Sequence, residues 1–222
     1  MIPLSDSRGS GQLAIWTYLI ILANIFVFYL ELSAPDLELF INQYALIPSQ
    51  VSWLDPVSWM GFITSQFLHG GWMHIISNLW FLRIFGDNIE QRFGYLWFPM
   101  FYLAAGIVGG LSQYLIAPDS AIPMIGASGA IAGVLGAYLA VYPHHKIKTL
   151  VPIVGFLSIV ELPATIMLAY WFITQLFAGG LGLDAIDTAQ GGVAYFAHIG
   201  GFVFGFIIGK LWPKTGTMTQ IE

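Results

Sequence analysis

The sequence has no cysteine and few charged residues. Its 222 residues include no Cys, and only 9% are Asp, Glu, Lys or Arg, compared with about 25% in a typical soluble domain. Without cysteine the chain has no disulfide, no thiolate nucleophile and no Cys-ligated metal. Seven basic residues stand against twelve acidic ones, and no basic run is present. This charge pattern argues against a nucleic-acid partner.

Apolar residues take the place of the missing charges. They make up 57% of the chain, and the mean hydropathy is +0.77. A soluble protein of this length cannot bury so much apolar surface, so the sequence predicts the lipid bilayer as its solvent. We expect one membrane domain over residues 13–212, between an N-terminal tail over 1–12 and a C-terminal tail over 213–222.

The expected fold class is an all-α membrane protein, a bundle of six transmembrane helices. Residues 31–72 hold acids, prolines and many aromatics but no Lys or Arg, which predicts a long, partly embedded first outer loop. We expect a turn over 86–94. Because Pro163 favours a helix start, we expect an interfacial or re-entrant piece over 149–160. The six expected spans cover residues 13–30, 73–85, 95–116, 128–142, 163–177 and 193–212.

The basic residues predict the orientation of the six spans. With an even number of spans both termini share one side, and Lys and Arg concentrate on the cytoplasmic side. We therefore expect a multi-pass protein of the cell membrane with both termini cytoplasmic. The basic residues expected on that side are Arg8, Arg83, Arg92, Lys146, Lys148, Lys210 and Lys214. The acids expected on the opposite, outer side are Asp36, Glu38, Asp55, Asp119, Asp184 and Asp187.

Four polar side chains are expected in the outer halves of the spans. His74 and Asn78 lie four residues apart and therefore share one helix face. Ser128 would lie ~8 Å, and His198 ~9 Å, below the outer boundary of a ~30 Å hydrocarbon core. Polar groups in lipid face the bundle interior or a water-filled cavity. We expect all four to meet at one level, open to the outer side.

Small residues predict which helices touch. Glycines recur every four residues in the sixth span, and small residues recur likewise from Ser128 in the fourth. Such faces let helix backbones approach closely in lipid. Packing the two together would bring the Ser128 hydroxyl near the His198 ring. The first set is Gly201, Gly205 and Gly209. The second is Ser128, Ala132, Gly136 and Ala140, with Gly129, Gly133 and Ala137 beside it.

The expected contact suggests nucleophilic catalysis. A serine hydroxyl needs a base, and histidine is the usual one. No acid accompanies His198, so the pair would be a dyad, with His74, Asn78 and the Ser128 backbone N–H as oxyanion donors. Each residue alone also has a structural reading: Ser128 as a packing residue, His198 as a satisfied interior histidine, and His74 and Asn78 as hydrogen-bonding partners of other helices. His69 is interpreted as structural, and no metal site is expected from the histidines because no acid lies near them.

Several motifs resemble the rhomboid family of intramembrane serine proteases. The resemblance covers the chain from about Trp59 to Gly209, and the motifs occur in order on the expected spans. They are Gly126-Ala127-Ser128-Gly129-Ala130; Ala197-His198-Ile199-Gly200-Gly201; His69 with His74 and Asn78; Gly86, Glu90 and Gly94; and Pro163-Ala164 with Trp171 and Gln175.

The resemblance implies a six-span rhomboid-like fold and an endopeptidase. It implies Ser128 as nucleophile, His198 as general base, and His74 and Asn78 as oxyanion donors. Substrates would be single-span membrane proteins cut in or near their transmembrane segment, without cofactor or metal. Gly126, Gly129, Gly201 and His69 would be structural residues near this site.

This chain differs from the family's motifs at two places, and two alternative functions are considered. Many family members have Trp-Arg where this chain has Met60-Gly61, and some have a tyrosine where it has Ala132. The first affects how the long outer loop is anchored, and the second what holds the His198 ring.

A rhomboid-like protein that binds membrane clients without cutting them would usually lack the serine or the histidine. A transporter would need related halves or a polar path to both sides.

Overall fold

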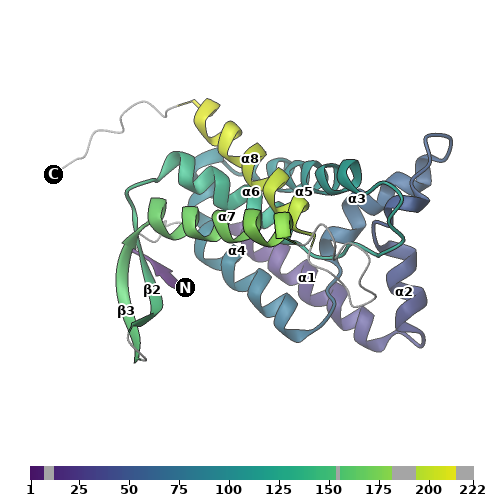
Figure 1. Ribbon diagram of the computed structural model, residues 1–222, viewed down its shortest axis with the longest axis horizontal. Coiled ribbons are helices and arrows are strands. Elements are labelled where there is room, and N and C mark those ends of the chain that lie inside the picture. Colours follow the sequence, from purple (N-terminus) through teal and green to yellow (C-terminus); the bar gives the residue numbers. More distant parts are fainter. Residues whose placement is uncertain (8–12, 154–155, 182–193, 214–222) are drawn as a thin grey trace.

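Six long helices and one small sheet form the protein in the computed structural model, which describes residues 1–7, 13–153, 156–181 and 194–213 (Figure 1). The sheet lies at the end of the molecule that also carries the N-terminus and the C-terminal end of the last helix. Four residues used in the expected orientation, Arg8, Asp184, Asp187 and Lys214, fall outside the described ranges. The long helices are α1 (Ile15–Ser33), α4 (Trp72–Phe93), α5 (Trp97–Ile116), α6 (Ser128–Val141), α7 (Ala164–Leu181) and α8 (Tyr195–Leu211).

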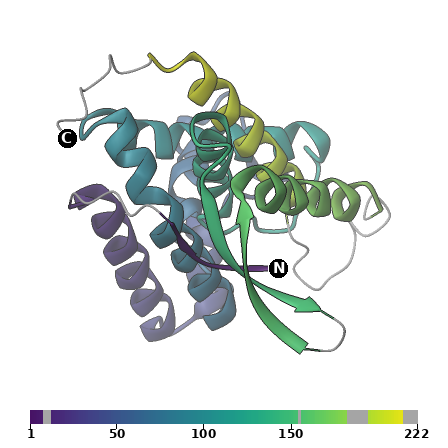
Figure 2. The same ribbon diagram turned by 90° about the vertical axis from the view of Figure 1, so that its left-hand side faces the viewer.

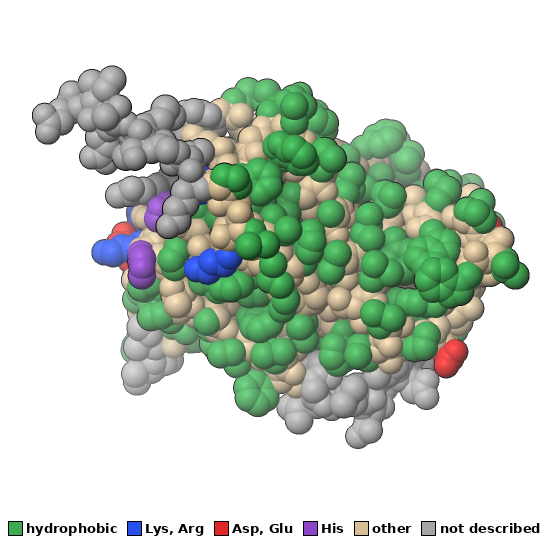
Figure 3. All heavy atoms as spheres, turned by 90° about the horizontal axis from the view of Figure 1, so that it is seen from above, with side chains coloured by type: hydrophobic (Ala, Val, Ile, Leu, Met, Phe, Trp, Pro, Cys, Tyr) green, Lys and Arg blue, Asp and Glu red, His purple; other side chains and the backbone are tan. Residues whose placement is uncertain are grey.

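The surface of the helices is apolar, as expected for a membrane protein. By length and composition α1 and α5 could cross a bilayer, and α6, α8 and the Ala164–Phe177 part of α7 are shorter apolar helices. Hydrophobic side chains cover most of the face in Figure 3, and the basic and histidine side chains gather at the end that carries the sheet. α4 carries Arg83, Asp87, Glu90 and Arg92 toward its C-terminal end.

α6 lies at the centre of the bundle. It contacts α4, α5, α7 and α8, and every residue from Gly129 to Tyr138 is buried. Its contact with α8 is backbone against backbone: a Cβ at Gly201 would lie 2.1 Å from the Gly129 carbonyl oxygen, and one at Gly205 would lie 1.9 Å from that of Gly133. The predicted contact between the two small-residue faces is therefore confirmed.

The expectation of an all-α chain is wrong. A three-stranded antiparallel sheet with strand order β1-β2-β3 is formed by β1 (Ile2–Asp6), β2 (Lys146–Ile153) and β3 (Phe156–Pro163). Part of the expected N-terminal tail and the expected re-entrant piece over 149–160 are therefore strands. The alternation of exposed Lys146 and Lys148 with buried Ile147 and Thr149 is the period of two typical of a half-buried strand.

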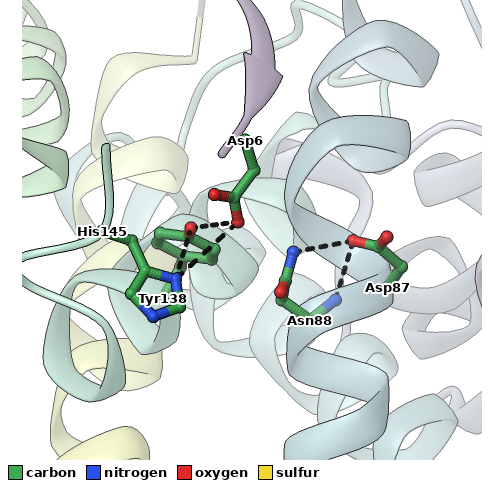
Figure 4. Close-up of polar contacts among 5 residues, drawn as sticks. All are labelled: Asp6, Asp87, Asn88, Tyr138 and His145. Carbon is green, nitrogen blue, oxygen red and sulfur yellow. Dashed lines mark hydrogen bonds and ion pairs between the residues drawn. The ribbon is translucent and has the colours of Figure 1, made fainter. Parts of the chain in front are cut away.

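The sheet is attached to the end of α6 by side chains. The Tyr138 hydroxyl donates a hydrogen bond to the Asp6 carboxylate of β1. His145 Nδ1 lies 3.4 Å from the Tyr138 oxygen and 3.9 Å from Asp6 Oδ2 (Figure 4). Asp87 and Asn88 of α4 lie beside this group, and the Asn88 backbone N–H donates to Asp87 Oδ1 at 2.8 Å. The group joins β1, α6 and the start of the hairpin.

The turn expected over 86–94 is helical, and α4 ends only at Gly94, whose φ is 86°. Gly86 is a packing residue, since a Cβ there would lie 3.0 Å from the Thr17 side chain of α1. Glu90 accepts hydrogen bonds from the backbone N–H groups of Trp16 at 2.9 Å and Thr17 at 2.8 Å, and from the Thr17 hydroxyl. Glu90 therefore satisfies free backbone N–H groups in the first turn of α1.

The first loop consists of short helices and is anchored by backbone contacts. A Cβ at Gly61 would lie 2.8 Å from the Ala45 carbonyl oxygen, so the glycine allows two parts of the loop to touch. The Gln66 side chain donates to the Leu103 carbonyl of α5 at 3.2 Å. The elements are α2 (Leu37–Tyr44), η1 (Pro48–Gln50), η2 (Pro56–Met60), α3 (Gly61–Thr64) and η3 (Ser65–Phe67).

Candidate active site

Ser128 is the first residue of α6, and the backbone before it allows a histidine to approach. Gly126 has a φ of 125°, a conformation that other residues rarely adopt. A Cβ at Gly126 would lie 2.6 Å from His74 Nε2. Glycine is therefore required here for two reasons, and the His74 ring can lie directly over the backbone that leads to Ser128.

Ser128 and His198 are joined by a hydrogen bond. The Ser128 Oγ lies 2.7 Å from His198 Nε2. The serine begins α6 and the histidine lies in the first turn of α8, so the close approach of these two helices brings the side chains together. The contact predicted from the small-residue faces is confirmed.

Gln175 of α7 holds the other side of the His198 ring. Its Oε1 lies 2.8 Å from His198 Nδ1. An amide oxygen only accepts, so this contact assigns the ring proton to Nδ1 and leaves the Nε2 lone pair for the serine hydroxyl. The Trp171 ring lies 6.0 Å from the His198 ring, one turn before Gln175. Gln175 and Trp171 therefore both contact the His198 ring from α7.

His74 and Asn78 line the same cavity as Ser128 and His198. The Gly70 backbone N–H donates to His74 Nδ1 at 3.3 Å, which assigns the ring proton to Nε2, the nitrogen nearest Gly126. The Asn78 Nδ2 is buried and has no hydrogen-bond partner among the described residues. A buried donor without a partner costs free energy, so these groups are suited to an acceptor supplied by a ligand.

A cavity of about 530 Å³ contains these side chains. Its polar wall includes the four expected site residues and two more, Gln175 and Ser77. The four are Ser128, His198, His74 and Asn78. Its apolar wall continues along α6 from the serine for two turns. The apolar residues are Phe81, Pro123, Met124, Ile125, Ile131, Leu135, Trp171 and Ala194.

The other residues expected near the site have packing positions. His69 is 2% exposed, its backbone N–H donates to the Glu31 carboxylate at 2.9 Å, and its ring packs edge-on against His74 at 5.2 Å. Gly129 and Gly201 form the α6–α8 contact. Over the described ranges, no three His, Asp or Glu side chains gather to hold a metal ion.

Sequence reasoning gave Gln175 no role in the site. A single glutamine on an apolar helix carries little signal, because its direction depends on how that helix packs. Its spacing of four residues from Trp171 was the available signal, since it puts the two residues on one helix face.

Comparison with known proteins identifies the family. The Rhomboid domain model matches residues 56–214. RHOMBOID-like protein 6, mitochondrial, of Arabidopsis thaliana is 32% identical over 161 residues, covering 69% of this chain and 45% of its own length. Rhomboid protease GluP of Bacillus subtilis (strain 168) is 30% identical over 207 residues, covering 90% of this chain and 36% of its own. This chain thus spans half or less of these relatives. It belongs to the rhomboid family.

Proposed function

We propose that this protein is an intramembrane serine endopeptidase that cuts single-span membrane proteins in or near their transmembrane segment. The observation that carries the proposal is the 2.7 Å hydrogen bond between Ser128 Oγ and His198 Nε2. His74 and Asn78 line the same cavity, and the Asn78 Nδ2 has no hydrogen-bond partner among the described residues. A relative that is named a rhomboid protease supports it. The apolar wall along α6 suits an apolar peptide segment as substrate.

Ser128 is the nucleophile in this proposal and His198 is its base. The serine oxygen attacks the carbonyl carbon of the scissile peptide while its proton passes to His198 Nε2. The ring is then an imidazolium, and its Nδ1–H is held by the Gln175 oxygen 2.8 Å away. Gln175 keeps the ring in the correct tautomer and orientation, as the aspartate does in a triad, but without a charge.

His74 and Asn78 stabilise the tetrahedral intermediate. Its oxyanion accepts hydrogen bonds from His74 Nε2–H and the Asn78 amide, and such preorganised donors often supply the largest share of catalysis. The C–N bond then breaks, and His198 returns its proton to the leaving amine. A water then attacks the Ser128 ester while its proton passes to His198. His198 returns this proton to the Ser128 oxygen as the C–O bond breaks, which releases the acid product and restores the free enzyme. No cofactor takes part in this sequence.

The proposed topology has six spans, with both termini cytoplasmic in the cell membrane and the site opening to the outer side. α6 has 14 residues, which at about 1.5 Å per residue is too short for a hydrocarbon core of ~30 Å. If its C-terminal end, next to the basic hairpin, lies at the cytoplasmic boundary, Ser128 lies below the outer one.

The test is cleavage of a tagged single-span substrate by the purified protein in lipid vesicles. We expect Ser128→Ala and His198→Ala to abolish cleavage, and a fluorophosphonate to label Ser128 only while His198 is present. Ser112→Ala is the matched control, because the Ser112 hydroxyl bonds to Val108 within its own helix, α5. Melting temperatures check that each variant is folded.

Undiminished cleavage by either site variant would refute the dyad. If the native protein binds the substrate and never cuts it, the function is that of a binding protein and the proposal fails.

A further inference from the structure

The distal half of the β2–β3 hairpin exposes large apolar side chains on both faces. Phe156 is 76% exposed, Leu157 is 72% exposed and Ile159 is 64% exposed. Alternation along β3 puts Leu157 and Ile159 on one face and Phe156 on the other. Side chains of this size are unfavourable in water on either face, so the hairpin needs an apolar environment around it.

The hairpin is attached at the level of two helix ends. The hairpin follows the end of α6 at Val141 and directly precedes the start of α7 at Ala164. Each strand has eight residues, which is ~26 Å at about 3.3 Å per residue. The distal end stands clear of the helices in two perpendicular views (Figures 1 and 2). It therefore lies beside the bundle, where a bilayer surrounds the protein.

Charge is confined to the base of the hairpin. Lys146 and Lys148 are exposed there, and Lys146 lies 3.6 Å from Glu161. Between Lys148 and Glu161 the sequence has no charged residue. Basic side chains attract anionic headgroups, and long apolar side chains beyond them enter the acyl boundary. The hairpin has this order of charge and apolar surface from base to distal end.

The base of the hairpin is held in place by the rest of the protein. β1 pairs with β2, and Asp6 of β1 accepts a hydrogen bond from Tyr138 of α6. Ile147 and Thr149 are fully buried at the base. The distal end is thus carried at a set distance from α6, the helix that begins with Ser128.

We propose that the distal half of this hairpin is inserted into the lipid interface on the side of the chain termini, as a membrane anchor for the sheet. Lipid can surround both apolar faces, whereas a protein surface would cover one. β3 is an edge strand of the described sheet, and its free backbone groups need water. The backbone of the hairpin therefore stays near the headgroups, and its apolar side chains reach the acyl boundary. The proposal does not depend on peptidase activity.

The absence of cysteine makes the test direct. Phe156→Cys and Leu157→Cys, one on each face, are labelled separately with an environment-sensitive fluorophore. The full chain is placed in nanodiscs of phosphatidylcholine and phosphatidylglycerol, in which both membrane surfaces are open to solvent. His144→Cys, at an exposed position just before β2, is the matched control.

We expect blue-shifted emission at both hairpin positions. Their fluorescence should be lost with lipids that carry a nitroxide on the acyl chain, and iodide should have little effect. The His144 label should behave in the opposite way. Quenching of both hairpin labels by iodide alone would overturn the proposal, since the hairpin would lie in water. Shielding from both quenchers would also overturn it, because a protein, such as a second copy of this chain, would then cover the hairpin. Substrate cleavage, measured on the same samples, reports separately on the proposed function.

Discussion

The His198 ring lies between two hydrogen bonds, one to the Ser128 hydroxyl and one to the Gln175 amide oxygen. Each contact constrains the other, because a ring with its proton on Nδ1 has its lone pair on Nε2. In the proposed mechanism a neutral oxygen therefore does part of what an acid does in a triad. The sequence predicted a dyad without an orienting group, and α7 supplies one.

Changing Gln175 should alter the pH dependence of cleavage. Gln175→Leu removes the acceptor, and we expect kcat/KM to fall about tenfold, less than the roughly 10²–10⁴-fold that an acid–base group itself contributes. In Gln175→Glu a carboxylate stabilises the imidazolium, so the acidic limb of the pH–rate profile should move to higher pH. The measurement is kcat/KM across pH for both variants.

A merely structural role for Gln175 makes a different prediction. Both variants would then lose activity equally at all pH values, with no displacement of the acidic limb. Tyr170→Phe is the control on the same helix, since the Tyr170 side chain is 46% exposed.

Asn78 is expected to act only after attack on the substrate. Its buried Nδ2 has no partner among the described residues, so its donor capacity is free for the oxyanion. Removing one oxyanion donor typically costs about 10²–10³ in kcat. We expect Asn78→Ala to lower kcat by that factor with little change in KM, as measured by steady-state cleavage. Asn88→Ala, near the other end of α4, should keep kcat, and an equal loss in both variants would count against the assignment.

At the scale of secondary-structure elements, the contact between α6 and α8 determines the geometry of the site. Gly205 faces the Gly133 carbonyl oxygen, and His198 lies two turns earlier on the same helix. A backbone atom cannot rotate away as a side chain can, so a larger residue at Gly205 must move the helix. A small displacement of two reacting groups relative to each other strongly lowers the reaction rate.

Gly205→Val should therefore reduce both stability and cleavage. Overpacking of this kind costs about 1–3 kcal/mol. We expect a lower melting temperature in detergent and a loss of cleavage larger than the loss of folded protein. Val203→Leu, at a position 43% exposed on the same helix, should leave both unchanged. If Gly205→Val were as stable and active as the native protein, the backbone contact would have no such role.

At the scale of the whole molecule, the sheet joins the N-terminus to the helix that carries the serine. Asp6 and Tyr138 are 132 residues apart in sequence and hydrogen-bonded in the structure. β1 also pairs with β2, so the strand completes a sheet that connects α6 to α7.

Tyr138→Phe should loosen this connection. Loss of a hydrogen bond to a charged group costs about 1.5–3 kcal/mol. We expect faster amide exchange in β1 and the paired part of β2, measured by hydrogen–deuterium exchange with mass spectrometry. Tyr170→Phe, at a position 46% exposed on α7, is the control. Unchanged exchange in β1 would show that strand pairing alone holds the N-terminus.

Most of the helices could be predicted from the sequence because their signals are local. The expected fourth span over 128–142 is α6 to within one residue, and the expected fifth span begins one residue before α7. The end of α4 could not be predicted, because glycines and acids between Gly86 and Gly94 are typical of a turn when their partners on α1 are unknown.

The sequence by itself determined the membrane as solvent, the contact of α6 with α8, and the meeting of Ser128, His198, His74 and Asn78 in one cavity. Hydropathy, helix length and small-residue spacing act along the chain, and they were sufficient for these features. Tertiary structure alone decided the sheet and the place of Gln175. Both depend on which distant segments meet: β1 pairs with residues that follow α6, and Gln175 reaches His198 only because α7 packs against α8.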